Sequence, residues 1–311
     1  MPRYLTVAAA QLGPVLRDEP RESVVKRLIA LLEQGKKAGC ELVVFPEMAL
    51  TTFFPRWYMA NKAETDEFFE RAMPNDRTQP LFEAAARLGV GFYLGYCEMF
   101  EEGGRTRRFN SAVLVDQKGR IIGKYRKVHV PGNRVYDPKL PYQHMEPYYF
   151  EDGDLGFPVW QAFGTTVGMA ICNDRRWPET YRVMALKGAE LIVLGFNSPS
   201  QLPDWPDQNV FRVQHHLVCM QAAAYQNGLW IVASSKAGRE EGVDMMGHSC
   251  IVAPSSDVVA VTQGLGDELI AYRCDLDLAP YYKSFFGFEQ NRRPEHYGII
   301  TQMQRQRLAA Q

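Results

Sequence analysis

In the first half of the chain, short apolar runs alternate with longer amphipathic segments. Residues 4–11 form an apolar run of strand length, and residues 21–37 repeat apolar side chains with the period of a helix. A second run at 42–45 and a second helical segment at 79–88 follow in the same order. This alternation predicts strands joined by helices, the pattern of an α/β fold with parallel strands.

The segments that follow have the pattern of antiparallel strands. Residues 91–100 form an apolar run, and the turn at 101–104 predicts a hairpin into 109–116. A second turn leads to a strand that ends at Lys127. Residues 131–154 then show no clear period and are rich in Pro, Tyr and charged residues. So long an irregular segment within a compact domain is usually functional.

The second half of the chain repeats this order of strands and helices. No Gly/Ser-rich linker or change of composition separates the halves, so we expect one pseudo-symmetric domain over residues 1–311. The elements expected in the second half are strands at 159–163, 166–172, 191–195, 230–234, 248–253, 258–261 and 269–275, and helices at 179–187 and 209–225.

The composition is that of an ordinary globular protein, with 46% apolar and 23% charged residues. A net charge of −1 gives no electrostatic reason to expect nucleic acid or a membrane surface as a partner. No apolar run reaches membrane-spanning length and the N-terminus has no signal-peptide layout, so we expect a cytoplasmic protein. Six cysteines without CxxC spacing fit reduced core thiols.

Three apolar runs stop at residues that carry chemistry. The run at 166–172 ends at Cys172, directly before charged residues and a helical segment. Ligands of parallel α/β sheets bind where strands lead into helices. The helix dipole and the guanidinium groups of Arg175 and Arg176 are expected to favour the thiolate. The alternative interpretation is a buried cysteine that ends a core strand.

Glu47 and Lys127 follow two other strands in the same manner. Glu47 comes after a proline that ends its strand, and Lys127 ends the strand of the second hairpin. A carboxylate, an amine and a thiol at three strand ends form a plausible base, electrophile and nucleophile. The alternative for Glu47 and Lys127 is a structural ion pair between neighbouring strands.

These motifs resemble the three motifs of the nitrilase superfamily, in that family's order. They are Phe45-Pro-Glu47, residues 123–129 and residues 171–179, and the likeness extends from about residue 5 to about residue 297. Residues 51–57, the Asn-Asp-Arg-Arg after Cys172 and residues 247–254 further resemble the N-carbamoyl-D-amino acid amidohydrolases. The resemblance implies an α/β fold with a four-layer α-β-β-α sandwich, and a homodimer or homotetramer. The C-terminal tail at about 277–311 is expected to take part in subunit contacts.

The resemblance also implies roles for the site residues. Cys172 is the nucleophile, Glu47 the base, and Lys127 holds the oxyanion together with the backbone N–H of Asn173. Glu146 lies in the irregular segment, where nitrilase-like enzymes commonly carry a second glutamate that supports the lysine and orients the substrate nitrogen. The alternative for Glu146 is a solvent-facing loop residue.

Other polar residues near the motifs are candidates for substrate binding. Arg175 and Arg176 suit a small-molecule substrate with a free carboxylate, because a guanidinium matches a carboxylate in bidentate geometry. One of them could instead pair with Asp174 or Glu179. The remaining candidates are Asn197, Ser198, His129 and His144. Threonine is expected in close relatives at positions 198 and 200, where this sequence has serine.

The sequence predicts neither a metal nor a cofactor, since the six histidines form no HExxH or HxH set and no phosphate-binding glycine loop follows a strand. The leading hypothesis is hydrolysis of N-carbamoyl-D-amino acids to the D-amino acid, ammonia and carbon dioxide. The preference for the D-series is implied by the resemblance alone. Alternatives are a β-ureidopropionase-like enzyme or another amidase or nitrilase with the same triad, and a catalytically silent scaffold.

Overall fold

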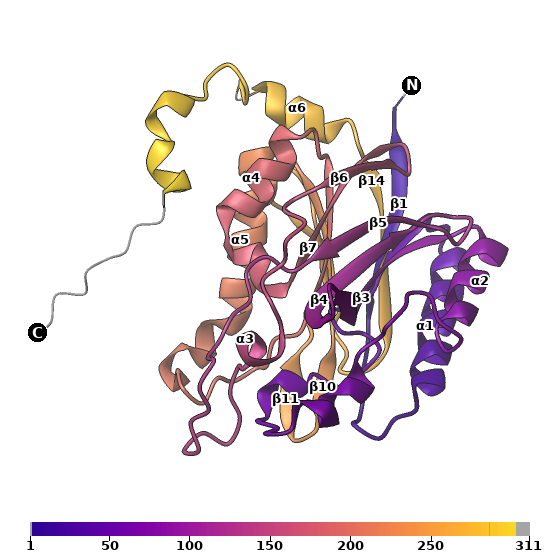
Figure 1. Ribbon diagram of the computed structural model, residues 1–311. Coiled ribbons are helices and arrows are strands. Elements are labelled where there is room, and N and C mark those ends of the chain that lie inside the picture. The colour runs from indigo at the N-terminus through magenta and orange to yellow at the C-terminus, as the bar shows by residue number, and fades with distance from the viewer. Residues whose placement is uncertain (1, 286, 303–311) are drawn as a thin grey trace, which may run out of the picture.

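The computed structural model describes residues 2–285 and 287–302 (Figure 1). Two six-stranded sheets pack face to face, and helices cover their outer surfaces. Helices α1 (Arg21–Lys37) and α2 (Gln79–Leu88) cover one sheet, whereas α4 (Pro178–Leu186) and α5 (Arg212–Asn227) cover the other. The predicted α-β-β-α sandwich is therefore confirmed.

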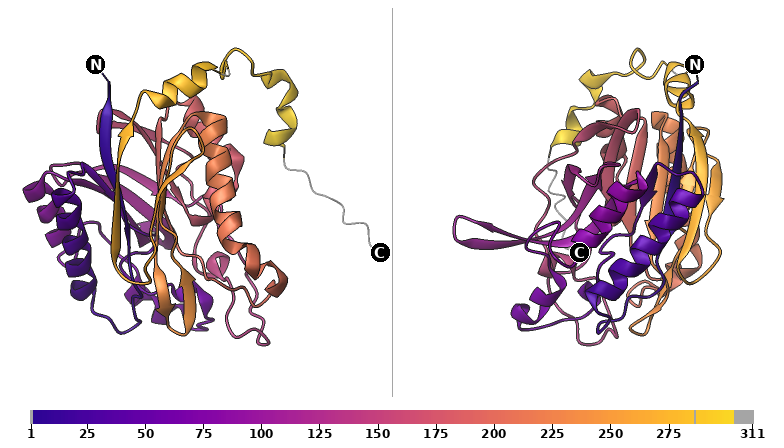
Figure 2. Two further views of the ribbon diagram at one scale, coloured as in Figure 1. Left: turned by 180° about the vertical axis from the view of Figure 1, so that it is seen from behind. Right: turned by 90° about the vertical axis from the view of Figure 1, so that its right-hand side faces the viewer.

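The first sheet has three parallel strands at its centre. Its order is β14-β1-β2-β3-β4-β5, and the pairs β1·β2 and β2·β3 are parallel while the outer pairs are antiparallel. The strands are β1 (Tyr4–Gln11), β2 (Leu42–Val44), β3 (Gly91–Glu102), β4 (Arg105–Val115), β5 (Ile121–Arg126) and β14 (Glu268–Asp275). The ends of β3 and β4 project as an exposed hairpin beyond the body of the molecule (Figure 2).

The second sheet repeats this plan. Its order is β13-β12-β9-β8-β7-β6, again with a parallel centre and antiparallel edges. Its strands are β6 (Val159–Ala162), β7 (Thr165–Ile171), β8 (Leu191–Phe196), β9 (Trp230–Ser235), β12 (Cys250–Val252) and β13 (Val258–Val261). The two sheets are not a simple duplication. Strand β14, from the second half of the sequence, pairs with β1 in the first sheet.

Several predicted boundaries differ from the structure, such as that of β4, which was expected to begin at residue 109 and begins at Arg105. The helix expected at 209–225 begins as a 3-10 turn, Pro206–Phe211, and becomes α-helical only from Arg212. The strand expected at 248–253 begins at Cys250, since His248 has a left-handed backbone with φ 55°. The short hairpin of β10 (Ala237–Glu240) and β11 (Val243–Met246) was not predicted, because its charged residues carry no alternating pattern.

The remaining helical segments are short. They are α3 (Glu146–Tyr149), α6 (Leu278–Phe285) and the 3-10 turns Phe54–Arg56, Lys62–Phe68, Cys172–Arg176, Pro294–His296 and Gly298–Thr301. The described part of the C-terminal tail lies beside α4 and α5, and residues 286 and 303–311 of the tail lie outside the described residues. Its role in subunit contacts stays a prediction. Within the described residues, no helix has the length and apolarity to cross a membrane.

Candidate active site

Cys172 occupies a strained position at the end of β7. Its φ of 45° lies in the left-handed region, which costs a non-glycine residue about 1–3 kcal/mol. The neighbouring Asp174 carboxylate stabilises this turn, because it accepts hydrogen bonds from the Ile171 N–H (3.0 Å) and the Tyr125 hydroxyl (2.7 Å). Cys172 is only 3% exposed.

The resting thiol is not activated in the way expected from the sequence. Burial raises the pKa of Cys172, and the negative charge of Glu47 raises it further, against the opposing charges of Lys127 and Arg175. The prediction that the surroundings favour thiolate was therefore wrong, because it counted the nearby cations and could not count burial. A protonated thiol needs a base, and Glu47 is the carboxylate that acts most strongly on it.

Glu47 is held in place by both its backbone and its carboxylate. A Cβ atom at Gly195 would lie 2.2 Å from the Glu47 nitrogen, so only glycine permits this close approach of β8. The carboxylate accepts hydrogen bonds from Lys127 Nζ (2.8 Å), Asn110 Nδ2 (2.7 Å) and the Asn197 N–H (2.8 Å). Three donors fix the carboxylate in one orientation.

Lys127 lies between two carboxylates. Its Nζ donates to Glu47 Oε1 at 2.8 Å and to Glu146 Oε2 at 2.6 Å, and all three side chains have no exposure. Burial alone would lower the pKa of Lys127, but the anionic groups around it, among them the carboxylates of Glu146 and Glu47, outweigh burial and raise the pKa. The side chain is therefore an ammonium at neutral pH, which can stabilise a developing oxyanion but cannot act as a base.

Glu146 belongs to this cluster and not to the solvent-facing surface. The irregular segment brings it to the site through hydrogen bonds from the Met145 N–H to the Pro55 oxygen (2.8 Å) and from the Gln143 N–H to the Arg56 oxygen (3.1 Å). Its Oε1 is buried and has no hydrogen-bond partner among the residues that the structure describes. Burial and the charge of Glu47 raise the pKa of Glu146 to about 7, although Lys127 opposes this. An unpaired buried acceptor beside an amine suits the NH₂ group of a substrate.

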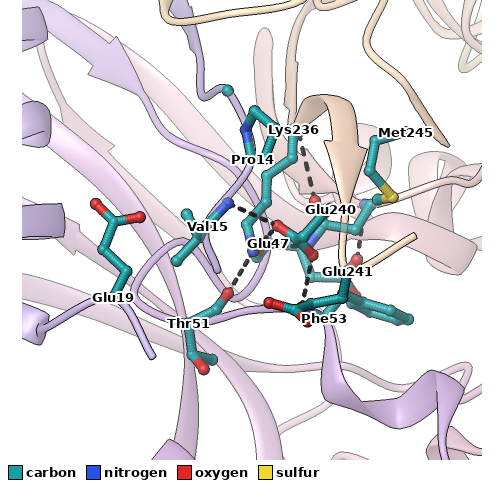
Figure 3. A network of polar contacts seen from close by, with 12 residues as sticks. Pro14, Val15, Glu19, Glu47, Thr51, Phe53, Lys236, Glu240, Glu241 and Met245 are labelled. Carbon is teal, nitrogen blue, oxygen red and sulfur yellow. Dashed lines mark hydrogen bonds and ion pairs between the residues drawn. The ribbon is translucent and has the colours of Figure 1, made fainter. Parts of the chain in front are cut away.

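Behind the cluster lies a second buried charge network that the sequence did not indicate (Figure 3). Glu240, at the end of β10, forms ion pairs with Lys236 (3.1 Å) and Arg56 (3.3 Å), and it accepts hydrogen bonds from the N–H groups of Phe53 (2.8 Å) and Val15 (3.0 Å). Although burial opposes ionisation, the two cations lower the pKa of Glu240. The network ties residues 53–56 to the hairpin of β10 and β11.

This network connects to both carboxylates that flank Lys127. On one side, Arg56 and Pro55 hold the segment of Glu146. On the other side, the Lys236 N–H donates to the Asn197 side-chain oxygen (3.4 Å), and Asn197 Nδ2 donates to the Glu47 backbone oxygen (2.7 Å). Asn197 is fully buried, and its side chain supports the backbone of Glu47.

A pocket of about 460 Å³ opens above Cys172. This volume lies within the range of small-molecule sites. The lining residues are Pro131, Gly132, Asn133, His144, Cys172, Asn173, Arg176, Ser198, Leu202, Asp204, Trp205, Gln208, Arg212 and His215.

The two arginines after the nucleophile have different surroundings. Arg175 is 1% exposed and does not line the pocket; it donates to the Cys172 oxygen (2.7 Å) and to Ser198 Oγ (2.9 Å) and lies over the Phe196 ring. Arg176 lines the pocket and donates to Asn173 Oδ1 at 3.4 Å. Within residues 2–285 and 287–302, neither forms an ion pair with a carboxylate. Arg176 is therefore the arginine that can meet a ligand.

Some of the other predicted binding residues line the pocket, and others do not. His144 lines the pocket, and burial lowers its pKa to about 3, so it is a neutral hydrogen-bonding group. Asn173 and Ser198 also line the pocket. His129 does not; its N–H and its ring Nδ1 both lie within hydrogen-bond distance of Asp174 (2.9 and 2.8 Å), and its ring stacks on Trp177. His129 thus supports the turn of the nucleophile.

Arg212 is a pocket residue that sequence reasoning missed. It begins α5, forty residues beyond Cys172 in sequence, and no motif marks it. The only available signal was a cation at the start of a helix that follows a Pro-rich loop. Such a cation is usually solvated, so the pattern alone could not identify it.

Comparison with known proteins agrees with the fold and the motifs. The family model of the carbon-nitrogen hydrolases matches residues 6–283. The chain therefore belongs to the carbon-nitrogen hydrolase family of the nitrilase superfamily and is a hydrolase of carbon–nitrogen bonds other than peptide bonds.

Individual relatives cover nearly the whole chain. A citrullinase from Francisella tularensis is 29% identical over 303 residues, 96% of this chain and 98% of the relative. An N-carbamoylputrescine amidase from Solanum lycopersicum is 29% identical over 310 residues, 96% and 95% of the two chains. A carbon-nitrogen hydrolase from Helicobacter pylori has the same fold, with a TM-score of 0.82 at 22% identity over 96% of this chain and 98% of that chain. An amidase from a Nesterenkonia species superposes with a TM-score of 0.68 at 19% identity, covering 94% of each chain.

Proposed function

We propose that the protein hydrolyses N-carbamoyl-D-amino acids to the D-amino acid, ammonia and carbon dioxide. The observation that carries the proposal is the buried cluster of Glu47, Lys127, Glu146 and Cys172 beneath a pocket whose wall includes Arg176. The names of the relatives support a ureido substrate, since citrulline and N-carbamoylputrescine both carry a carbamoyl group on nitrogen. The choice of the D-series rests on the resemblance of the motifs.

In the first half of the reaction, Glu47 takes the thiol proton and Sγ of Cys172 bonds to the ureido carbon. Lys127 Nζ and the Asn173 N–H stabilise the negative charge that develops on oxygen. The bond from carbon to the terminal NH₂ group then breaks. That group leaves as ammonia with the proton that Glu47 received, and a carbamoyl thioester remains on Cys172.

In the second half, water replaces ammonia at the same position. Glu47 accepts a proton from the water as its oxygen bonds to the carbonyl carbon, and the carbon–sulfur bond breaks with return of the proton to Sγ. The carbamate that leaves decomposes to carbon dioxide and the free amino acid. A covalent adduct at the active-site cysteine of the structurally similar Nesterenkonia amidase, formed with the acetamide moiety of fluoroacetamide, supports this use of Cys172.

The pocket wall favours an anionic substrate. Arg176 lacks a carboxylate partner among the described residues, whereas a substrate carboxylate would supply one. A substrate ammonium, such as that of N-carbamoylputrescine, would instead face Arg176 and Arg212 and be repelled. This argues for an N-carbamoyl amino acid over an N-carbamoyl amine.

The direct test is ammonia release from a chiral panel of N-carbamoyl phenylalanine, methionine and β-alanine, with a simple amide and a nitrile for comparison. We expect turnover of the D-α-carbamoyl acids. A preference for carbamoyl-β-alanine would make the protein β-ureidopropionase-like with the same triad. Turnover of only the amide or the nitrile would contradict the proposal.

The role of Arg176 predicts a sharp loss with an uncharged substrate. Removing the carboxylate from the substrate forfeits a charge-assisted hydrogen-bonded pair, at a cost of about 1.5–3 kcal/mol for the exposed Arg176 guanidinium. We therefore expect kcat/KM for an N-carbamoyl amino acid to exceed that of its carboxamide by about 10- to 100-fold. Arg176→Met should abolish the difference, while Arg87→Met on α2, in the opposite outer layer, should retain it. Equal rates for acid and amide in the unmodified protein would contradict the assignment.

The pKa of Glu146 predicts a loss of activity in acid. Its carboxylate form accepts hydrogen bonds from Lys127 and, through Oε1, from the substrate nitrogen. Since the pKa is raised to about 7, this form is present above pH 7 and is lost as the pH falls through that value. A plot of kcat/KM against pH should therefore fall about tenfold per unit below pH 7. Glu146→Gln should lower kcat and remove this limb, whereas Glu151→Gln in the same segment should keep it. A limb near pH 7 that persists in Glu146→Gln would refute the assignment.

A further inference from the structure

The pocket contains more positive charge than one substrate carboxylate requires. Arg176 and Arg212 both line it, and the buried Arg175 lies directly behind Cys172. The lining includes one carboxylate, that of the exposed Asp204. Within the part of the chain that the structure describes, no ion pair joins Asp204 to either lining arginine. One bidentate guanidinium suffices for one carboxylate, so a second cation remains unassigned.

Arg212 is held in position for a ligand. Its Nε and Nη2 both donate to the Pro199 oxygen, at 3.3 and 3.1 Å, which orients the planar guanidinium against the loop that follows β8. Its Nη1 donates to no acceptor among residues 2–285 and 287–302, and the side chain is half-buried. Burial and the positive charge of Arg175 lower the pKa of Arg212, and the charge of Asp204 opposes this only in part, so an added anion would stabilise the cation further.

Arg176 and Arg212 reach the pocket from different elements. Arg176 belongs to the turn that carries the nucleophile. Arg212 comes from the start of α5, next to the loop that contains Leu202 and Trp205. This loop side of the pocket is the part that a substrate side chain would occupy when the α-carboxylate meets Arg176.

We propose that Arg212 binds a second anionic group on the substrate side chain. The preferred substrates are then N-carbamoyl amino acids of the dicarboxylic class, in which one carboxylate meets Arg176 and the other meets Arg212. This inference rests on the proposed hydrolysis of N-carbamoyl amino acids and adds the class of side chain to it. The chemistry at Cys172 is unchanged.

The test compares nearly isosteric substrates that differ in one charge. Ammonia release is measured with N-carbamoyl-glutamate against N-carbamoyl-glutamine and with N-carbamoyl-aspartate against N-carbamoyl-asparagine, each in both hands. We expect kcat/KM to favour the acid by about 10- to 100-fold, the range of one charge-assisted hydrogen-bonded pair. Raised salt should reduce the ratio only modestly, because the pair is partly buried.

Variants of Arg212 identify the residue responsible. Arg212→Met should bring the ratio of acid to amide close to one, mainly by lowering kcat/KM for the acid. Arg212→Lys should keep part of the preference, because the charge remains while the bidentate geometry is lost. The control Arg87→Met should leave the ratio unchanged, and circular dichroism should show that every variant is folded.

The outcomes separate this inference from the proposed function. Ammonia from carbamoyl-phenylalanine without a preference for acidic side chains would overturn the role of Arg212 and leave the proposed function intact. If Arg212→Met lowered kcat/KM equally for the acid and the amide, the role of Arg212 would also be overturned, because both arginines would then hold the same α-carboxylate. No ammonia from any N-carbamoyl amino acid would overturn both.

Discussion

Cys172→Ala is expected to fold normally and to lose hydrolysis by at least roughly three orders of magnitude, because it removes the pocket-lining thiol on which Glu47 acts. Alanine keeps the Cβ atom of cysteine, so the left-handed backbone at position 172 is no more strained than before. The Asp174 carboxylate still accepts the hydrogen bonds that hold the turn. Cys172→Ser should be similarly inactive, since a hydroxyl is a much weaker nucleophile than a thiolate.

Two quantities are measured: the ammonia released from one N-carbamoyl amino acid, and the mass of the intact protein after incubation with that substrate. The unmodified protein should show a carbamoyl adduct that maps to Cys172 when the reaction is quenched. Cys40→Ala is the matched control, because Cys40 is buried beneath α1 in a separate apolar cluster and has no contact with the pocket residues. Substantial turnover by a folded Cys172→Ala protein would remove the mechanism.

Glu47→Gln is expected to lower kcat by about 10²- to 10⁴-fold with little change in KM. The thiol is protonated at rest, since burial and the charge of Glu47 itself raise the pKa of Cys172. An amide cannot take the thiol proton, so the nucleophile is not generated. Removing the carboxylate charge should also lower the thiol pKa, because the negative charge of Glu47 is the largest cause of the shift after burial.

This second effect gives a test that loss of structure alone would not mimic. The rate of iodoacetamide reaction at Cys172, followed against pH, should have its midpoint at lower pH in Glu47→Gln than in the unmodified protein. Asp116→Asn is a suitable control, as Asp116 is a carboxylate at a turn that pairs with Arg120 outside the site. A midpoint that moves to higher pH, or a variant that only raises KM, would show that Glu47 is not the base.

Much of the fold could be predicted from local pattern. Helix α1 was predicted with the observed bounds, Arg21–Lys37, because its apolar positions follow a strict helical period. The parallel strands read as short apolar runs because both of their faces are buried. The pairing of β14 with β1 could not be predicted, since no local pattern specifies a partner 271 residues away, as for Tyr4 and Asp275.

In the candidate site, too, some features follow from local sequence and others from long-range packing. The sequence by itself determined that Glu47, Lys127 and Cys172 stand at strand ends, because a change from apolar to charged residues is local information. The tertiary structure decided which of Arg175 and Arg176 meets a ligand, since consecutive residues of a turn point in different directions.

Only the tertiary structure, likewise, could give the sign of the thiol pKa shift and the presence of Arg212 in the pocket. The thiol pKa depends on burial, which is set by the packing of both sheets and not by the neighbours of Cys172 in sequence. Arg56 and Glu240 form an ion pair although they are 184 residues apart in sequence. The strength of this ion pair depends on the exclusion of solvent by packing. Motifs therefore fix which groups are available, while distance and burial, which arise from long-range packing, fix what each group can do.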